Sequence, residues 1–561
     1  MKPVRVPLKK APVWSLFCLL LFLLSPAQAA KDPAAAAIAS AHPLATAAGH
    51  EILQQGGNAF DAAVAVSAVL AVVEPYSSGI GGGGFWLLHR ASDGYETMVD
   101  GRERAPLAAT RDLYLDEAGH VIPNLSINGP LAAGIPGEPA ALVHLSQGYG
   151  RLPLKQVLAP AIRIAREGFP VDAHYLRMVN WRLEPLRADP AAAAVFLHDE
   201  QAPELGSLIY QPDLADTLQR LADEGAAGFY RGELAKQLVA GVKAAGGIWE
   251  LEDLARYKVV EREPIRSRYM GLTITSAAPP SSGGVALATM LNILQGFNLP
   301  TVEEPQRTHL IVEAMRRAYR DRADYLGDPD YVDIPVKALT HPWYAAGLAR
   351  DIEMNKASPS VGNLAHEEGR DTTHFSVLDR EGNRVSATLS INYPFGSCFM
   401  VAGTGVLLND EMDDFSASPG VPNVYGLVGA EANAIAGGKR MLSSMSPTFV
   451  EDEGQLAILG TPGGSRIITM VLLGILEMAD GKGAQAWVER PRFHHQYLPD
   501  VIEFEPEAFS ENLRKQLKAM GHELKQLDHS YGNMQAIYWD KRSGRVEAAS
   551  DPRGIGEAKI H

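Results

Sequence analysis

The chain has 561 residues, of which 46% are hydrophobic and 21% are charged, so it can build a large apolar core. Its formal net charge is −15, which argues against nucleic acid or an anionic membrane surface as a partner, because both bind basic surfaces. On length alone a chain of this size would form roughly three or four domains. No charge block, internal repeat or low-complexity tract beyond the Ala-rich residues 34–37 supports such a division.

Residues 1–29 have the pattern of a secretory signal peptide. Four basic residues accompany an apolar run of 14 residues from Ala11 to Leu24, and Ala27-Gln28-Ala29 offers small residues for cleavage. The run is short for a membrane anchor, since a helix needs about 20 residues to span a bilayer. We therefore expect cleavage after Ala29 and a periplasmic or secreted protein with no membrane attachment. Removal of this segment would take the formal charge from −15 to −19, because it contains four basic and no acidic residues.

The two cysteines predict a mature protein without an internal disulfide. Cys18 would leave with the signal peptide, which leaves Cys398 alone. No motif surrounds Cys398, so we interpret it as a small packing residue rather than a nucleophile.

An apolar segment, residues 58–73, predicts a buried helix with a polar cap at its start and an end at Glu74-Pro75. The glycines that follow, Gly79 to Gly84, match the G-x-G-x-x-G pattern of dinucleotide-binding loops. That function requires a strand before the loop and a helix after it, whereas here the order is helix, loop and strand (85–89). The run is therefore interpreted as a turn that allows close backbone packing.

Further elements predict a mixed α/β protein. Residues 152–168 and 307–325 have helical periodicity and look like covering helices. Near the C-terminus, strand-like segments (501–504, 534–539 and 545–549) surround a predicted helix at 510–520. Strands and helices in both halves favour an α/β sandwich.

The most informative segment is a predicted β-hairpin at residues 373–391, because Thr372 stands at its leading edge. The alternation of residues predicts a half-buried first strand, with Phe375 and Val377 inside and His374 outside. A threonine hydroxyl is a weak nucleophile, and one way to activate it is a free α-amino group on the same residue. That amine exists only if the Asp371-Thr372 peptide bond is broken.

Taken alone the hairpin is ordinary, but the motifs around it are specific in combination. In this order they closely resemble the γ-glutamyltransferases (glutathione hydrolases), which are N-terminal-nucleophile hydrolases, and the resemblance covers almost all of the chain after the signal peptide. The motifs are 102–106 (RERAP), 134–137 (GIPG), 280–284 (PSSGG), 407–415 (LLNDEMDDF), 439–448 (KRMLSSMSPT), 461–466 (TPGGSR) and 491–496 (PRFHHQ).

The resemblance implies a four-layer αββα sandwich and a precursor that cleaves itself before Thr372. Residues 30–371 would form the large subunit and residues 372–561 the small subunit of one intertwined heterodimer. The Thr372 hydroxyl would attack the carbonyl of Asp371, and water would hydrolyse the resulting ester.

In the mature enzyme the resemblance implies that Thr372 attacks the γ-carbonyl of glutathione or a related γ-glutamyl compound. The γ-glutamyl group then passes to water or to the amine of an amino acid or dipeptide. Ser390 would hydrogen-bond the nucleophile, and the backbone N–H groups of Gly463 and Gly464 would stabilise the oxyanion. We expect no metal or organic cofactor; the adjacent His494 and His495 point to opposite faces of a strand and are poor co-ligands.

A glutamyl group carries a free α-carboxylate and a free α-ammonium, so its site needs a guanidinium and acids. Arg102 matches the carboxylate-binding arginine of the family, and Ser443 and Ser444 match hydroxyl donors to the same group. The ammonium acceptors are matched by Glu411 and Asp414, with Asn392 beside them. Without the resemblance, the acids would be a solvated loop; their spacing is not that of an EF-hand calcium loop.

Three positions qualify the match. Ser390 stands where the family has threonine, and Met441 stands where proline is usual. Residues 419–430 resemble the lid loop of members that cover the glutamyl site, with Tyr425 as the lid aromatic.

Two alternatives remain. The first is an amidase of the same fold acting on glutaryl groups, such as a cephalosporin acylase; Asp414 and the Ser443-Ser444 pair favour glutamyl, because a glutaryl group has no ammonium. The second is an uncleaved protein that only binds γ-glutamyl peptides, against which the retention of Thr372, Gly463 and Gly464 argues.

Overall fold

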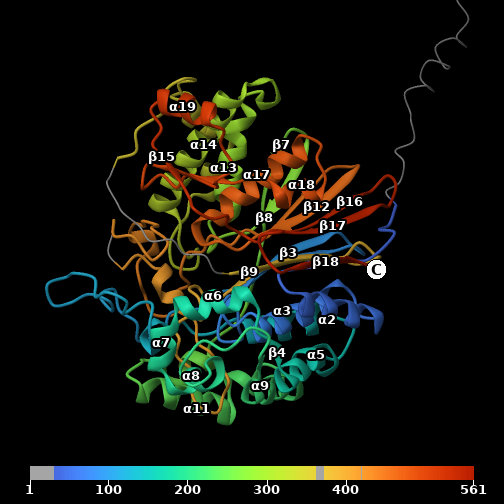
Figure 1. The fold of residues 1–561 in the computed structure, drawn as a ribbon, viewed down its shortest axis with the longest axis vertical. Coiled ribbons are helices and arrows are strands. Elements are labelled where there is room, and N and C mark those ends of the chain that lie inside the picture. Colours follow the sequence, from blue (N-terminus) through green and yellow to red (C-terminus); the bar gives the residue numbers. More distant parts are fainter. Residues whose placement is uncertain (1–30, 362–371, 418–419) are drawn as a thin grey trace, which may run out of the picture.

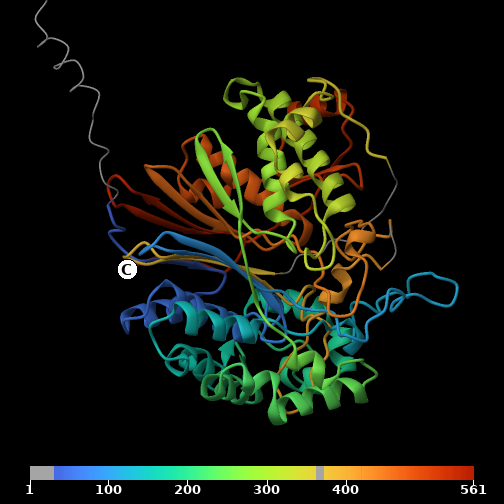
Figure 2. The ribbon, with the colours of Figure 1, turned by 180° about the vertical axis from the view of Figure 1, so that it is seen from behind.

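Two β-sheets stack at the centre of the molecule, and a layer of helices covers the outer face of each (Figure 1). The view from behind shows the same layers (Figure 2). The structure, a computed structural model, describes residues 31–361, 372–417 and 420–561. The order of layers confirms the expected αββα sandwich. The predicted signal peptide (1–29), Asp371 and the first residue of the predicted lid, Pro419, lie outside the described residues.

The first sheet has seven strands, and every neighbouring pair is antiparallel. In spatial order they are β18 (Glu557–Ile560), β1 (Ala37–Ser40), β9 (Thr373–Leu378), β10 (Arg384–Ser390), β2 (Gly83–Arg90), β3 (Tyr95–Gly101) and β6 (Val260–Arg262). Strand β1 thus lies between β9 and β18, so the N-terminal strand is held on both edges by strands that follow Thr372.

The second sheet has six antiparallel strands. Their order is β17 (Val546–Ser550), β16 (Gln535–Asp540), β12 (Gln455–Gly460), β11 (Thr448–Glu451), β8 (Leu272–Ser276) and β7 (Ile265–Tyr269). Here too the chain before and after Thr372 is joined, at the β8–β11 pair. Two smaller sheets are formed by β13 (Phe493–His494), β14 (Ile502–Phe504) and β15 (Leu524–Gln526), and by β4 (Phe169–Pro170) and β5 (Leu208–Ile209).

Two groups of helices form the outer layers (Figure 1). The first sheet is covered by the group α2 (Pro43–Gln54), α3 (Ala59–Val73), α4 (Glu138–Tyr149), α5 (Leu154–Glu167), α6 (Ala173–Trp181), α7 (Leu183–Ala188), α8 (Pro190–Phe196), α9 (Pro212–Glu224), α10 (Ala227–Tyr230), α11 (Gly232–Ala244) and α12 (Leu251–Ala255). The second sheet is covered by the group α13 (Gly283–Gln295), α14 (Glu304–Tyr325), α15 (Val336–Leu339), α16 (Pro342–Ala349), α17 (Ile467–Ala479), α18 (Ala484–Glu489) and α19 (Glu511–Ala519).

The predicted hairpin is present as β9 and β10, but the expectation that its first strand is half-buried was wrong. All six residues of β9 are buried. Phe375 and Val377 pack in the core beneath the first helical layer, as predicted. His374 and Ser376 face the second sheet instead of solvent, and the Ser376 hydroxyl donates to the carbonyl of Gln535 in β16 at 3.1 Å. The stacking of a second sheet therefore buries the polar face of the strand.

The predicted buried helix is α3, and all fifteen of its residues are buried. Asn58 caps it: its side-chain oxygen accepts from the N–H groups of Phe60 and Asp61 at 3.0 Å, while Asp61 accepts from the Asn58 N–H. A helix that is apolar on every side needs neighbours on every side, and α3 packs against α2, α4, α5 and the first sheet. Strand β2 follows the glycine run, which confirms the order that excludes a dinucleotide loop.

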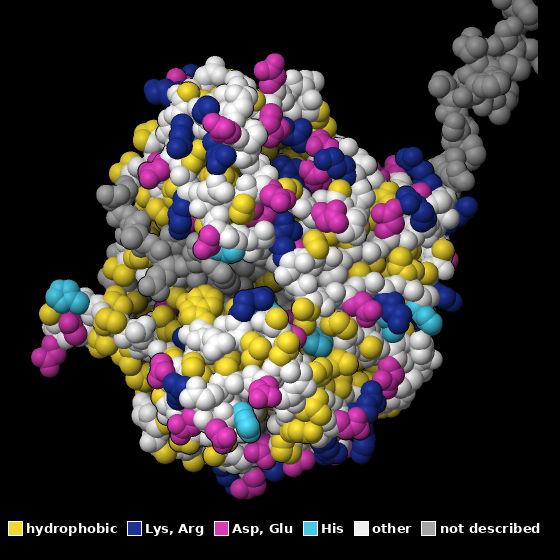
Figure 3. Space-filling model, viewed as in Figure 1, with side chains coloured by type: hydrophobic (Ala, Val, Ile, Leu, Met, Phe, Trp, Pro, Cys, Tyr) yellow, Lys and Arg dark blue, Asp and Glu magenta, His cyan; other side chains and the backbone are white. Residues whose placement is uncertain are grey.

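The other predicted elements are present with shifts of at most three residues at their ends. They are α5, α14, α19, β14, β16 and β17. Within the described residues no helix is both long and apolar enough to cross a membrane. On the face drawn in Figure 3 acidic and basic side chains are interspersed.

The buried carboxyl of Glu138 should make the stability of the folded protein depend on pH. It lies at the first position of α4, is fully buried, and neither of its oxygens has a hydrogen-bond partner among the described residues. Burial raises the pKa of Glu138 to about 8. The folded protein therefore keeps a proton that the unfolded chain releases near its ordinary pKa, so this residue makes stability fall as pH rises from about 5 to about 8. We expect the Tm of Glu138→Gln to fall less between pH 5 and pH 8 than the Tm of wild type falls.

The control for this measurement is Glu233→Gln in the first turn of α11, where the side chain is 81% exposed. That variant should show the wild-type difference in Tm between pH 5 and pH 8. An equal pH dependence in Glu138→Gln and wild type would contradict the assignment of a buried, protonated carboxyl.

Candidate active site

Ten of the eleven predicted catalytic and substrate-binding residues line one small cavity. They come from segments that are far apart in the chain and meet where the two sheets lie against each other. The ten are Arg102, Thr372, Ser390, Asn392, Glu411, Asp414, Tyr425, Ser443, Ser444 and Gly464. The eleventh, Gly463, lines a second cavity that also contains Thr372.

Thr372 directly precedes β9 and is 6% exposed. The antiparallel register of β9 with β10 places Ser390 beside it, and Thr372 Oγ1 lies 3.3 Å from Ser390 Oγ. Ser390 Oγ in turn accepts from the Asn392 N–H at 2.8 Å, which orients the serine. The φ angle of Thr372 is +149°, a value that residues other than glycine rarely adopt. The hydroxyl at Ser390 therefore contacts Thr372 even though a threonine was expected there.

Arg102 forms the centre of a buried ion-pair cluster. It follows β3 and is 1% exposed. Its guanidinium donates to Glu411 Oε2 and to Asp414 Oδ2, each at 2.5 Å, and lies 3.6 Å from Glu103 Oε2. The two acids are three residues apart in a short 3₁₀ turn, η3 (Glu411–Asp414), whose period of three residues places both on one side.

The cluster holds more carboxyls than guanidiniums. Burial raises the pKa of Glu411, and Arg102 opposes that rise. Burial and the neighbouring Glu411 together raise the pKa of Glu103, whose two oxygens have no hydrogen-bond partner among the described residues. One oxygen of Glu411 is likewise unpartnered in the described part of the chain. Glu411 lines the cavity and Glu103 does not, so a ligand ammonium placed there would find one acceptor, the Glu411 oxygen, that the protein itself leaves unsatisfied.

Ser443 and Ser444 line the same cavity and reveal an arginine that the sequence analysis missed. Arg322 of α14 donates to Ser444 Oγ at 3.3 Å and to Ser282 Oγ at 3.1 Å. It is buried, which lowers the pKa of its guanidinium from the ordinary value. The sequence predicted a helix at 307–325, but nothing in its pattern shows which arginine turns toward the site.

Asn409 is a second residue that the sequence analysis missed, although it lies in a quoted motif. Its Nδ2 donates to the carbonyls of Gly81 and Gly134 at 2.7 and 2.8 Å. Its Oδ1 accepts from the N–H groups of Gly134 and Glu411 at 2.9 and 3.0 Å. Asn409 thereby ties the start of η3 to two glycine-containing segments of the large half.

The predicted lid residue covers this cavity. Tyr425 OH donates to the carbonyl of Asn392 at 2.7 Å, and Val424 N–H donates to Asp413 at 2.9 Å. Asn423 donates at 3.0 Å to Asp414 Oδ1, the oxygen that does not bind Arg102. A Cβ atom on Gly464 would come within 2.5 Å of the Tyr425 ring, so the ring fits here because glycine has no side chain.

Gly463 and Gly464 stand at the beginning of α17. Their φ angles are +135° and +56°, and the short turn η5 (Gly464–Arg466) leads from them into the helix. The N-terminal end of a helix carries partial positive charge and N–H groups that suit a developing oxyanion. Both glycines line cavities that also contain Thr372.

The histidines offer no metal centre next to Thr372. In the described residues the one cluster with ligand spacing is His309, Glu313 and His522, which lines neither cavity at Thr372. There His309 Nδ1 lies 2.8 Å from His522 Nε2, while Glu313 already pairs with two arginines. His494 and His495, as expected, have different partners: Thr469 and Gln496 for the first, Asp500 and Tyr497 for the second.

A four-layer αββα sandwich with a threonine at the head of its central strand is the arrangement of the N-terminal-nucleophile hydrolases. The family model described as gamma-glutamyltranspeptidase matches residues 45–561. Glutathione hydrolase proenzyme from Escherichia coli (strain K12) is 42% identical over 529 residues, which cover 93% of this chain and 90% of that protein. The chain therefore belongs to the γ-glutamyltranspeptidase family, and it is an enzyme.

Two solved structures support the same assignment. Cephalosporin acylase from Bacillus halodurans matches with a TM-score of 0.83 and 29% identity, over 95% of this chain and 96% of that one. A chain of the gamma-glutamyltranspeptidase of Helicobacter pylori matches with a TM-score of 0.56 and 39% identity, over 57% of this chain and 92% of its own length. The fold is thus shared by transpeptidases and acylases, and the site residues must distinguish them.

The contact between Gly464 and Tyr425 predicts the effect of one methyl group. Gly464→Ala should push the Tyr425 ring aside, because the new Cβ would clash with it. The hydrogen bond from Tyr425 OH to the Asn392 carbonyl would then break. Added protease should cut the loop at 420–429 faster in this variant than in wild type, and mass spectrometry of the fragments would measure the rate.

Gly481→Ala is the matched control. Gly481 has a φ of +80° but no atom within 4 Å of its Cβ position, so the variant carries comparable backbone strain without the clash. Equal protection of the loop in both variants would show that Gly464 does not seat the lid.

Proposed function

We propose that this protein is a self-cleaving γ-glutamyltransferase that removes the γ-glutamyl group of glutathione and related compounds. The observation that carries the proposal is the single cavity in which a threonine hydroxyl, a buried arginine and two carboxylates meet. The names of the relatives, glutathione hydrolase and proenzyme, support both the substrate and the cleavage.

Cleavage would occur between Asp371 and Thr372. The Thr372 hydroxyl attacks the Asp371 carbonyl, the acyl group moves from nitrogen to oxygen, and water hydrolyses the ester. The unusual φ of Thr372 supports this step, because backbone strain beside the bond is relieved when the bond breaks. The pairing of β1 with β9 and β18, and of β8 with β11, would hold the subunits 30–371 and 372–561 together afterwards as a heterodimer.

After cleavage the free amine of Thr372 would act as general base for its own hydroxyl. The oxygen attacks the γ-carbonyl, and the leaving amine takes the proton. N–H groups at Gly463 and Gly464 would stabilise the oxyanion, a contribution of roughly 3 kcal/mol for one donor in other hydrolases. Water or the amine of an amino acid or dipeptide then attacks the acyl-threonine and releases the γ-glutamyl product. These steps use only groups of this chain and its substrates.

Binding of the glutamyl end would replace the ion pairs of Arg102 with Glu411 and Asp414 by ion pairs of these groups with the ligand. The ligand carboxylate would bind Arg102 with the hydroxyls of Ser443 and Ser444, and the ligand ammonium would bind Asp414 and Glu411 beside Asn392. Tyr425 would cover the bound group. Ammonium recognition by Glu411 requires its ionised form, so its raised pKa implies weaker binding as the pH falls.

The glutaryl acylase is the second candidate, because an acylase shares the fold over nearly the whole chain. A glutaryl group lacks the ammonium, so it would leave Asp414 and Glu411 without a cationic ligand. The retention of both acids beside Thr372 favours glutamyl. For the location we propose export to the periplasm or beyond, supported by the signal-peptide pattern of residues 1–29.

Thr372→Ala tests the self-cleavage. Wild type should yield two fragments divided between Asp371 and Thr372 and should hydrolyse γ-glutamyl-p-nitroanilide; the variant should give one chain and no turnover. Thr373→Ala is the control, because that hydroxyl donates to Glu74 and should be dispensable for cleavage. Intact mass and anilide turnover measure both outcomes, and cleavage of Thr372→Ala at the same bond would overturn the mechanism.

Asp414→Asn tests the choice between glutamyl and glutaryl. The variant keeps the size of the side chain but loses the charge that binds the ammonium, a change of about 1.5 to 3 kcal/mol for a hydrogen bond to a charged group. We expect kcat/KM for the γ-glutamyl anilide to fall about 10- to 100-fold, while that for a glutaryl anilide changes little. An equal fall for both substrates would mean that Asp414 only supports Arg102.

A further inference from the structure

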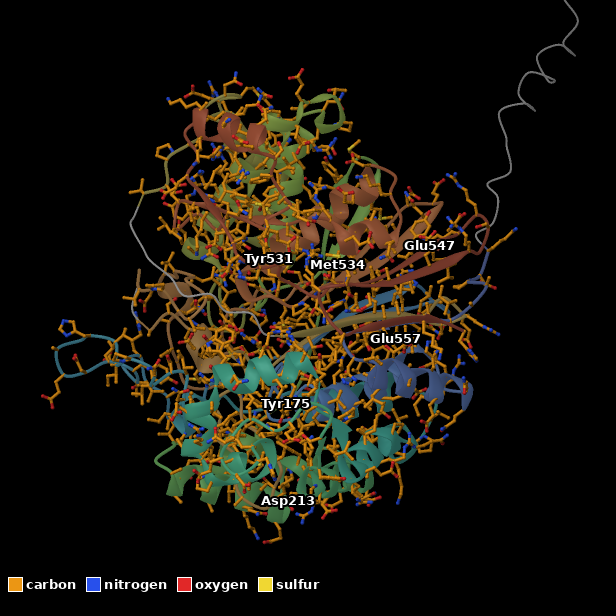
Figure 4. All side chains as sticks on the ribbon, in the orientation of Figure 1. Tyr175, Asp213, Tyr531, Met534, Glu547 and Glu557 are labelled. Carbon is orange, nitrogen blue, oxygen red and sulfur yellow. The ribbon has the colours of Figure 1, made fainter. Side chains whose placement is uncertain are left out.

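A second cavity of about 330 Å³ meets the first at Thr372. Tyr531 lines it from the half of the molecule that carries the second sheet, and residues of α6 line it from the other half. Figure 4 shows Tyr531 on one side and Tyr175, the α6 neighbour of His174, on the other. Because the first cavity is covered by Tyr425, the part of a substrate beyond the γ-amide bond must extend from Thr372 into this second space.

The charges that line the second cavity are predominantly positive: three arginines face one carboxyl. Two of the arginines are already committed, since Arg466 pairs with Glu503 at 2.5 Å and Arg553 pairs with Glu505 at 2.7 Å. Arg177 differs. It is exposed on α6, and its guanidinium donates to a neutral group, His174 Nδ1, at 2.7 Å. Within the described part of the chain it forms no ion pair with a carboxylate.

His174 holds Arg177 in place. Its ring packs edge-on against Tyr76 with centroids 5.0 Å apart, and its Nδ1 accepts from the guanidinium. Burial and Arg177 lower the pKa of His174 to about 4, so the imidazole stays neutral and keeps that acceptor at neutral pH. The guanidinium is thus oriented by one N–H while its other donors remain available for a carboxylate.

The opposite polarity is found at the Thr372 end. Glu74 lines the cavity there and accepts from Thr373 Oγ1 at 2.7 Å. Burial raises the pKa of Glu74 to about 7, so Glu74 becomes ionised as the pH rises through that value, and its ionised form would repel a carboxylate and attract an amine. The cavity therefore presents an acid near the nucleophile and a cation at α6, which matches an amino acid or dipeptide with its amine toward Thr372.

We propose that Arg177 binds the free carboxylate of the leaving group and of the amine acceptor, both of which the proposed transfer places in the second cavity. The inference rests on the proposed γ-glutamyl transfer and deepens it. It names the ligand as a short peptide or amino acid with an unblocked C-terminus, such as the cysteinylglycine part of glutathione. In this orientation the amine that attacks the acyl-threonine stands where the leaving amine departed, and its carboxylate pairs with Arg177.

The test compares three donors with wild type and Arg177→Ala: glutathione, its glycine monoethyl ester, and γ-glutamyl-p-nitroanilide. The ester and the anilide lack the carboxylate that Arg177 would bind. We expect wild type to prefer glutathione to the ester about tenfold in kcat/KM, and Arg177→Ala to lose that preference through a higher KM for glutathione. Arg177→Lys should restore part of it, because a charge remains without the fork of donors.

Arg220→Ala is the matched control, since Arg220 is an exposed arginine of α9 that lines neither cavity. It should behave as wild type with all three donors. An unchanged preference in Arg177→Ala, or an equal loss with all three donors, would overturn the role of Arg177. Anilide turnover reports the proposed function by itself: if wild type hydrolyses no γ-glutamyl donor, both proposals fall, and if the anilide is hydrolysed, only the role of Arg177 is in question.

Discussion

The arrangement of the site depends on strand β9, which is paired on both edges and covered on both faces. Its edges are held by β1 and β10, and its faces pack against α3 and the second sheet. A residue at the head of such a strand has little freedom to move, because the main-chain hydrogen bonds fix the strand along its whole length. Thr372 is therefore held where two cavities meet, and the register of the hairpin supplies Ser390 beside it.

The same burial explains why the charges of the site form a cluster. Arg102 is withdrawn from water, and removing one partner from a buried pair costs about 3 to 5 kcal/mol, so the guanidinium needs Glu411 and Asp414 when no ligand is present. Burial, together with neighbouring carboxyls, raises the pKa of Glu411 and Glu103. A ligand with both a carboxylate and an ammonium can replace each internal bond with one of its own. This exchange is the physical basis on which we propose a zwitterionic glutamyl group rather than a singly charged one.

In the proposed reaction the two cavities would divide the substrate at the bond that breaks. The smaller one combines acids and hydroxyls under the Tyr425 lid, and Glu74 and Arg177 line the larger one. Thr372 and the glycines at the start of α17 belong to the boundary between them. Under the proposed function, recognition on both sides would orient the amide bond toward a single hydroxyl.

The sequence by itself determined the type of fold and much of the local structure. The apolar residues 58–73 predicted α3, and the alternation after Thr372 predicted β9 and β10. The family resemblance pointed to ten residues that one cavity brings together. Local patterns carry this information because helix and strand periods are properties of neighbouring residues. They do not report what a strand packs against, so the full burial of β9 was not predicted.

Only the tertiary structure decided which polar residues meet. Arg322 and Asn409 join the site through contacts between segments more than a hundred residues apart. Arg177 lies on a helix without any motif, and only the folded chain brings it to the cavity that Thr372 also lines. Such contacts depend on long-range packing, which no local pattern of residues encodes.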